Sequence, residues 1–128
     1  MPAYNTARFD PPAPLARVTL RNPSTGATQL DVLMLLDSGA DVTLIPQATV
    51  SLLEAAAIPN SKYELAGFDG NVSLASVVRL ELLLCGRTFR GRFLLIDQEW
   101  GILGRNVLNS IPVLLDGPHL AWDEYCPG

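Results

Sequence analysis

The amino-acid sequence predicts a single all-β domain with one or two short helices. Short runs of apolar and β-branched residues are separated by Gly, Pro, Asn and Asp, which favour turns, and this pattern is typical of a mainly antiparallel β fold. Only residues 47–58 have the leucine and alanine content of a helix. The 128 residues, 48% hydrophobic and 17% charged, suit one compact domain with a buried core.

The first 14 residues differ in composition from the rest of the chain. They contain four prolines, Pro2, Pro11, Pro12 and Pro14. Proline lacks an amide hydrogen and fixes φ, so this stretch is a poor candidate for a helix or a strand ladder. We expect residues 1–14 to form a flexible N-terminal arm and residues 15–128 to form the domain.

The domain is expected to open with a hairpin formed by residues 15–22 and 29–37. Both segments are apolar, and the residues between them, in the run NPSTGAT, are rich in turn formers. The second strand becomes more apolar toward its end, which predicts that burial deepens up to Asp37. Pro46 suits the start of a helix, so a helix is predicted over residues 47–58, before Pro59.

A second, longer hairpin is predicted over residues 62–84. Its two arms are apolar and β-branched, and GFDG at 67–70 forms a glycine-bracketed tip between them. The run CGR then turns the chain into another strand over residues 88–97.

The C-terminal part continues the same pattern. Residues 100–111 run from an apolar strand end into a helix-like turn, and residues 112–122 contain two short strands joined by an Asp-Gly turn. No segment of the chain repeats another, which excludes a solenoid.

Charge and composition exclude several classes of function. The net charge of −4 lacks the basic footprint of a nucleic-acid-binding protein, and no apolar run approaches the ~18 residues of a membrane span. The N-terminus does not resemble a secretory signal, so a cytoplasmic location is expected. The two cysteines show no Cys-x-x-Cys spacing, and we predict no metal and no cofactor.

Residues 35–41, LLDSGAD, place Asp37 directly after a strand that is predicted to be buried. A carboxylate in this position is normally hydrated, paired with a cation or used in a reaction. The run GADVTLI is similar to an ankyrin-repeat loop, but no second copy follows at the ~33-residue spacing of such repeats. An EF-hand calcium loop also fails, because Asp37 and Asp41 lack the further oxygen ligands and the closing glutamate.

Four segments, in this order, resemble aspartic peptidases of the retropepsin type: LLDSGAD at 35–41, LAGFDGNVSL at 65–74, GILG at 101–104 and GRN at 104–106. Asp-Ser-Gly alone is a weak signal, but its combination with ILGRN far along the chain is specific. The resemblance covers roughly residues 15–115. It implies a retropepsin-like lobe, a closed or partly open β-barrel with a flap hairpin, that works as a homodimer.

Amide hydrolysis explains why a second copy is needed. One carboxyl must activate a water while another protonates the carbonyl oxygen, and two carboxyls ~3 Å apart can share the single proton that this requires. The chain contains one Asp-Ser-Gly motif, and Asp69-Gly70 and Asp116-Gly117 are better explained as turns. A two-fold axis that brings Asp37 against its symmetry mate would supply the dyad.

The resemblance also implies roles for the residues around Asp37. Asp37, Ser38 and Gly39 would form the catalytic motif, with the Ser38 hydroxyl hydrogen-bonding across the dimer beneath the dyad. Ala40 is small enough to let substrate approach. Asp41 would bind the substrate main chain and be held by Arg105, although a purely structural ion pair is an equal alternative. Structural support is assigned to three residues, Gly104, Arg105 and Asn106.

Further substrate contacts are implied in the flap and the side-chain pockets. The flap tip comprises Gly67, Phe68, Asp69 and Gly70, and its glycines would let it turn and close over a peptide. Phe68 would touch substrate or be a plain surface aromatic. Val42, Trp100 and Ile102 match positions that line apolar pockets in similar enzymes, and each is also a candidate for ordinary core packing.

Two features depart from the retroviral pattern. Leu15 stands about where those enzymes have an arginine before the first strand, and residues 112–128 add what looks like a hairpin after the helix. Retroviral subunits interleave their terminal strands, so the dimer here is expected to use a different sheet. The pattern is closer to bacterial or other cellular single-lobed relatives than to a viral enzyme.

The sequence therefore predicts a homodimeric aspartic endopeptidase acting on a peptide or protein. The alternative is a retropepsin-like dimerisation or peptide-binding module without activity. A serine hydrolase is a third hypothesis, but it would need Ser38 to meet the single histidine, His119, and no Gly-x-Ser-x-Gly motif is present.

Overall fold

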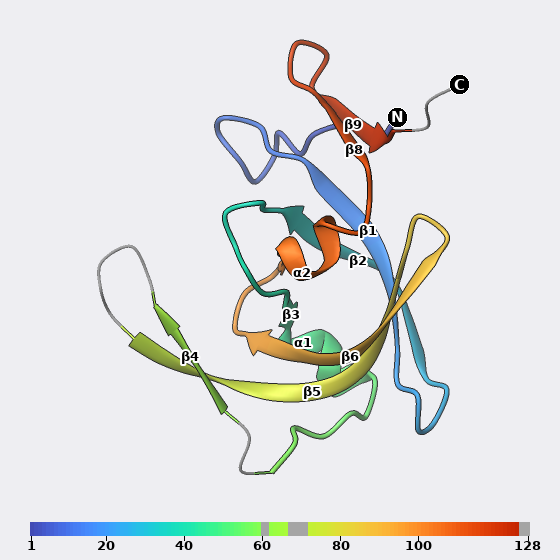
Figure 1. The fold of residues 1–128 in the computed structure, drawn as a ribbon, viewed down its shortest axis with the longest axis vertical. Helices are drawn as coiled ribbons and strands as arrows, with labels where there is room; N and C mark the ends of the chain where they lie inside the picture. The colour runs from blue at the N-terminus through green and yellow to red at the C-terminus, as the bar shows by residue number, and fades with distance from the viewer. Residues whose placement is uncertain (60–61, 67–71, 126–128) are drawn as a thin grey trace.

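The computed structural model describes residues 1–59, 62–66 and 72–125 and confirms a mostly β fold (Figure 1). Its elements are, in order, β1 Leu15–Arg21, β2 Thr28–Leu36, β3 Leu44–Pro46, α1 Gln47–Leu52, β4 Lys62–Ala66, β5 Val72–Leu84, β6 Arg87–Ile96, β7 Gly101–Leu103, α2 Arg105–Leu108, β8 Val113–Asp116 and β9 Ala121–Glu124. Within those described ranges, no helix has the length and apolar character needed to cross a bilayer.

Seven strands form one sheet in the order β1-β2-β7-β3-β6-β5-β4, and β1 also pairs with β5. This last pairing closes the sheet into a barrel, from which β4 extends as an outer strand. The predicted hairpin is confirmed as β1 and β2, which are antiparallel, whereas β2 runs parallel to β7. The barrel therefore brings the ends of β2 and β7 side by side, although more than 60 residues separate them in sequence.

The barrel interior follows from alternating side chains. In β1, Ala16, Val18 and Leu20 are buried while Arg17 is exposed, as expected for a strand with one face toward the core. Met34 of β2 is buried with them in the main hydrophobic cluster. A second, smaller cluster is formed by Leu44, Ala75, Val77 and Leu94, with Val42, Ile58, Ile96 and Ile102 partly buried against it.

A buried carboxylate lies where the barrel closes. Glu81 of β5 is directly opposite Arg21 of β1 on one side and Arg90 of β6 on the other. Its two oxygens accept from both guanidinium groups, at 2.7 Å from Arg21 Nη2 and 2.6 Å from Arg90 Nε. The hydrogen bonds from Arg90 and then Arg21 lower the pKa of Glu81 below its usual 4.5. Two cross-strand ion pairs therefore join three strands at this seam.

Because the folded-state pKa of Glu81 is lowered, the ionised form stabilises the fold. This contribution is fully present above pH 4.5 and is lost as the pH falls through the lower folded-state value. We expect Glu81→Gln to lower the thermal midpoint at pH 6 and to flatten its dependence on pH between 6 and 3. Thermal melts of both proteins across this range measure the effect, and parallel curves would contradict it.

The helix predicted over residues 47–58 is present but covers only Gln47–Leu52, so its predicted end was wrong. The observed helix, α1, ends at Leu52, and Leu53 is its C-cap. Glu54 follows with a φ of 54°, a left-handed conformation that an α-helix cannot continue through. The alanines at 55–57 therefore lie in an irregular segment, from which the Ile58 amide donates to the Val77 carbonyl at 2.7 Å.

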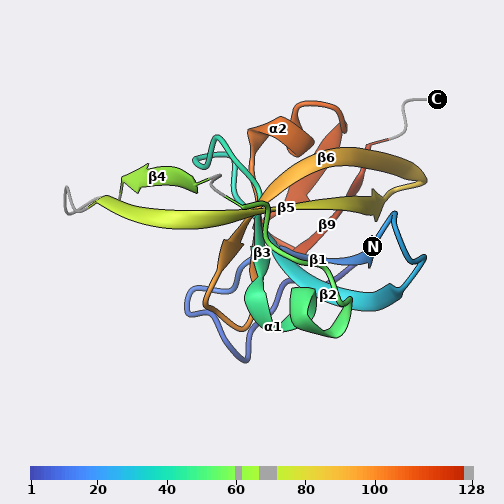
Figure 2. The same cartoon turned by 90° about the horizontal axis from the view of Figure 1, so that it is seen from below.

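The long hairpin predicted over residues 62–84 is present as β4 and β5. Five residues of β5, 72–76, pair with β4, and residues 77–84 pair with β6 in the barrel. Figure 2 shows the β4–β5 pair reaching well beyond the barrel. The predicted tip at 67–70 lies outside the described residues.

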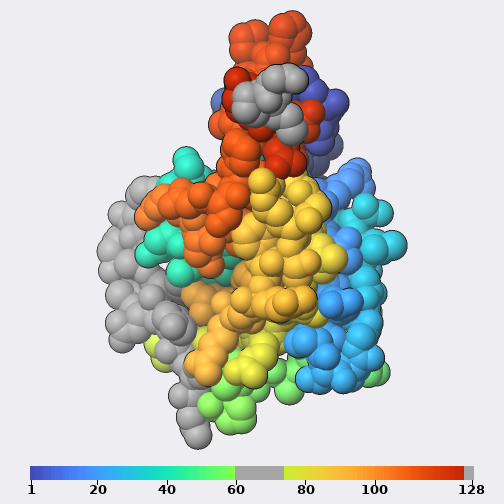
Figure 3. Space-filling view, turned by 45° about the vertical axis from the view of Figure 1, so that its right-hand side comes forward, coloured from blue at the N-terminus to red at the C-terminus, as the bar shows by residue number. Residues whose placement is uncertain are grey.

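The predicted C-terminal hairpin is confirmed as β8 and β9, a separate two-stranded sheet. Figure 3 shows the β8–β9 segment standing out from the body of the barrel. The N-terminal arm is bonded to it: the Tyr4 amide donates to Leu120 O at 2.7 Å, and the Trp122 amide donates to Pro2 O at 2.9 Å. These backbone hydrogen bonds along the outer edge of β9 were not expected for a flexible arm.

Candidate active site

Asp37 is the first residue after β2, and the barrel fixes its backbone from two sides. The Asp37 amide donates to the carbonyl of Leu103, at the end of β7, at 3.0 Å. The preceding amide, of Leu36, donates to Pro14 O at 3.0 Å. The sequence places Asp37 at the end of a strand, and the parallel β2–β7 pairing makes that end a rigid position.

The loop after Asp37 turns around its carboxyl group. Asp37 Oδ1 accepts a hydrogen bond from the Gly39 amide at 3.0 Å, and the Ala40 amide donates to Asp37 O at 3.1 Å. A Cβ at position 39 would lie 3.1 Å from Asp37 Oδ1, which is tighter than ordinary contact. Glycine at this position therefore lets the backbone approach the carboxyl closely. Asp37 is half-buried, while Ser38 and Gly39 are exposed.

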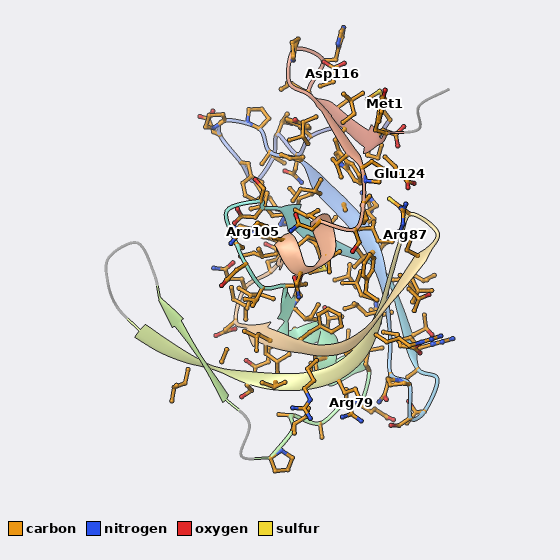
Figure 4. The ribbon with its side chains drawn as sticks, in the orientation of Figure 1. Met1, Arg79, Arg87, Arg105, Asp116 and Glu124 are labelled. Carbon is orange, nitrogen blue, oxygen red and sulfur yellow. The ribbon has the colours of Figure 1, made fainter. Side chains whose placement is uncertain are left out.

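A second connection, between β7 and α2, packs directly against this loop. A Cβ on Gly104 would lie 2.2 Å from Val42 O, so only glycine fits there. The φ of Gly104 is −90°, which any residue adopts, and the requirement is therefore one of space alone. The Arg105 amide donates to Ala40 O at 2.8 Å, and Arg105 Nη1 donates to Ser38 O at 2.7 Å (Figure 4).

These contacts give Arg105 a supporting role different from the expected one. Asp41 and Arg105 are both described by the structure, and no ion pair joins them; the guanidinium binds the Ser38 carbonyl instead. Arg105 thus holds the backbone of the Asp37 loop rather than a second carboxylate. Asp41 is exposed, and its proposed contact with a substrate main chain stays a prediction.

Thr43 is a site residue that the sequence analysis missed. Its side chain is buried, its hydroxyl donates to Asn106 Oδ1 at 2.7 Å, and it accepts from the Gly104 amide at 3.1 Å. One hydroxyl therefore bridges the Asp37 loop and α2, and it also gives Asn106 a structural contact. A polar residue inside the apolar run VTLIP was the available signal.

The predicted pocket residues occupy mixed positions. Val42 and Ile102 are half-buried and pack against the smaller cluster, so each contributes to the core and keeps an accessible surface. Trp100 is half-buried and its ring contacts Phe9 of the N-terminal arm, with centroids 4.9 Å apart. Four predicted flap residues, Gly67, Phe68, Asp69 and Gly70, lie outside the described part of the chain.

The serine hydrolase hypothesis finds no support in this geometry. His119 Nδ1 lies 2.8 Å from Asp116 Oδ2 in the turn between β8 and β9. No hydrogen bond between His119 and Ser38, both described, is present. The pair His119–Asp116 is exposed on the histidine side and stabilises the turn, together with the His119 amide.

Comparisons with known proteins identify the family of this chain. A family model described as retroviral aspartyl protease matches residues 12–116. Among solved structures, the fold is similar to EIAV protease complexed with the inhibitor HBY-793, with a TM-score of 0.59 and 23% sequence identity, covering 84% of this chain and 91% of that one. No curated protein matches the chain. Because the family match spans most of the barrel and the Asp-Ser-Gly loop within it, the chain belongs to the retroviral-type, or retropepsin-like, aspartyl protease family.

Proposed function

We propose that this protein is a homodimeric aspartic endopeptidase whose catalytic dyad is Asp37 and the Asp37 of a second copy. In this mechanism the two carboxyls share one proton. The ionised carboxyl takes a proton from a water, and that water attacks the peptide carbonyl carbon. The other carboxyl gives its proton to the carbonyl oxygen. Collapse of the resulting diol, with protonation of the leaving nitrogen, breaks the C–N bond.

One observation carries the proposal: Asp37 and Gly39 form a hydrogen-bonded turn at the end of β2, and Arg105 of the β7–α2 connection donates hydrogen bonds to the same loop. Asp37 N, Gly39 N and Arg105 each anchor this turn to a different group. A carboxyl held in this way keeps its orientation without reorganising during the reaction, which is what general acid–base catalysis needs. The β4–β5 hairpin is proposed as the flap that closes over a bound peptide.

Dilution tests whether the activity belongs to the dimer. One carboxyl per chain cannot act as both base and acid, so specific activity on a peptide library should fall with the fraction of dimer. At a tenth of the dissociation constant the expected loss is roughly sevenfold. Specific activity measured across the dissociation constant, determined by sedimentation, gives the result. Constant specific activity in a sedimenting monomer would contradict the shared dyad.

Mixing gives an independent measurement of the same requirement. A ninefold excess of Asp37→Asn should capture wild-type chains in heterodimers that hold one carboxyl, and wild-type activity should fall about tenfold. Excess Asp31→Asn, which keeps Asp37, is the control and should leave the activity per wild-type chain undiminished. A fully folded dimer without hydrolysis of any library peptide would instead favour the peptide-binding module.

A further inference from the structure

We propose that the outer face of β5 and β6 binds an acidic segment of the polypeptide substrate. This inference rests on the proposed function and adds a substrate class to it: chains in which aspartate or glutamate residues flank the apolar stretch that is cut. The surface is built by four arginines of three adjacent strands, which we call the arginine cluster: Arg21, Arg79, Arg90 and Arg92.

The arginine cluster lies on the side of the strands that faces away from the core. In β5, Val78 and Leu80 are buried, so Arg79 between them points outward. Figure 4 shows Arg79 on the outer side of β5. The register places Arg92 of β6 directly opposite Arg79, and Arg90, two residues earlier in β6, lies on the same face. These three arginines are all exposed.

The positive charges of the cluster outnumber its one acidic residue. Glu81 accepts hydrogen bonds from Arg21 and Arg90, but Arg90 uses only its Nε for this, and its side chain is 75% exposed. The side chains of Arg79 and Arg92 form no ion pair or hydrogen bond within the described ranges of the chain. Four guanidinium groups around one carboxylate leave an excess of three positive charges, in a chain whose net charge is −4.

The pairing of Arg79 with Arg92 is unfavourable in the free protein. Like charges directly opposite one another on adjacent strands destabilise a sheet. A carboxylate placed between the two guanidinium groups would accept hydrogen bonds from both, and such bonds are stronger than those between neutral groups. An acidic ligand therefore replaces a repulsion with two attractions.

The spacing of the cluster fits an extended acidic peptide. Arg90 and Arg92 are two residues apart in β6, which is about 6.7 Å along a strand. Acidic side chains at alternate positions of an extended polypeptide repeat with the same period. A nucleic acid would instead require a basic surface that follows several phosphates, and the acidic chain does not favour one. The cluster therefore fits a short acidic segment of a polypeptide.

One end of the arginine cluster lies beside the candidate active site. Arg92 borders a hollow of about 190 Å³ whose lining also includes Val42, Thr43 and Asn106. Val42 is a candidate substrate contact, and the Thr43 hydroxyl bonds the connection that supports the Asp37 loop. A chain that crosses Arg92 thus continues toward the site of cleavage, which favours the substrate over an unrelated partner.

The first experiment measures peptide binding to the Asp37→Asn protein, in which hydrolysis is not expected. A labelled peptide with alternating glutamates should bind at least roughly tenfold more tightly than the same peptide with glutamines in their place. Fluorescence anisotropy at about 50 mM salt gives both affinities, and most of the difference should disappear at about 500 mM salt because exposed charges are screened.

Substitutions in the same protein locate the binding surface. Arg79→Gln and Arg92→Gln should each weaken binding of the acidic peptide about fivefold. Neither change should lower the thermal midpoint, because each removes the repulsion between two opposed arginines. The matched control is Arg17→Gln, which also removes one positive charge. Arg17 is exposed on β1 and lines a separate hollow beside Asp123, so this control should bind as tightly as its parent.

The second experiment measures whether hydrolysis depends on the cluster. Two peptide libraries share a randomised apolar segment, which one library flanks with Asp and Glu and the other with Asn and Gln. At low substrate concentration the wild type should hydrolyse the acidic library at least roughly fivefold faster, through a lower KM. In Arg92→Gln the ratio of the two rates should fall toward one, whereas Arg17→Gln should keep the wild-type ratio.

The outcomes separate this inference from the proposed function. Equal affinity for the acidic and the glutamine peptide, or equal weakening by Arg92→Gln and Arg17→Gln, overturns the arginine cluster as a binding surface. Tighter binding of a single-stranded oligonucleotide of the same charge overturns the assignment to a polypeptide. Selective binding without selective hydrolysis overturns the role in substrate choice. If no library is hydrolysed while Arg92 still contributes to binding, the proposed peptidase fails and the acidic-peptide surface stands.

Discussion

Asp37→Asn is expected to abolish peptide hydrolysis, with a loss of at least ~10⁴-fold in kcat, because both carboxyls of the dimer are replaced. Asparagine cannot act as the base and cannot hold the shared proton. The fold should survive the change, since the Asn Oδ1 can still accept from the Gly39 amide, as Asp37 Oδ1 does at 3.0 Å. Initial rates on a peptide library, with sedimentation and thermal melts of the same samples, measure both expectations.

The control for this substitution is Asp31→Asn on β2. Asp31 is exposed and has a φ of 56°, a conformation that asparagine also tolerates, so neither folding nor activity should change. Turnover by Asp37→Asn near the wild-type rate, in protein free of contaminating peptidase, would show that another group performs the chemistry.

Gly104→Ala is expected to destabilise the fold by about 3 kcal/mol and to remove activity with it. The new methyl group would lie 2.2 Å from Val42 O and 2.5 Å from Val42 C. Both are backbone atoms, so relief requires the loop after Asp37 to move away from the β7–α2 connection. That movement would disturb the bonds from Arg105 to Ala40 and Ser38. Denaturant unfolding and peptidase assays of the variant test both effects.

Gly117→Ala provides the comparison for a glycine without such a contact. A Cβ at position 117 meets nothing within 4 Å, and Gly117 has no positive φ that would strain an alanine. Its free energy of unfolding should stay within ~0.5 kcal/mol of the wild-type value. Equal stability of Gly104→Ala and Gly117→Ala would mean that the loop adapts to the methyl group at little cost.

Local patterns were sufficient to predict most elements of the fold. The hairpins and the position of Asp37 depend on apolar runs and turn residues that are neighbours in sequence, and β1–β2 and β8–β9 formed as expected. The length of α1 was not predictable in this way. The alanines at 55–57 favour a helix. The helix nevertheless ends at Leu52, Glu54 adopts a left-handed conformation, and the Ile58 amide then donates to the carbonyl of Val77 on β5.

Contacts between residues distant in sequence were also hard to predict at the candidate site. Asp37, Ser38 and Gly39 could be proposed as the catalytic motif because they are contiguous in sequence and carry a recognisable pattern. Thr43 was missed and Arg105 was assigned the wrong partner, because both depend on how the β7–α2 connection packs against a loop more than 60 residues earlier. The partners of side chains that are this far apart in sequence depend on which strands pair. A single sequence does not specify that pairing precisely enough to predict contacts between individual atoms.

The continuity of β5 has a mechanical consequence for the proposed enzyme. The strand is 13 residues long; its first five pair with β4, and from Val77 onward it is part of the barrel wall. The strand is therefore anchored in the barrel from Val77 onward, and the hydrogen bond from the Ile58 amide to the Val77 carbonyl adds a further restraint there. A continuous strand that is anchored at one end is expected to bend along its length. The stiffness of β5 would set how readily a substrate is admitted, so substitutions where β5 enters the barrel can tune that admission.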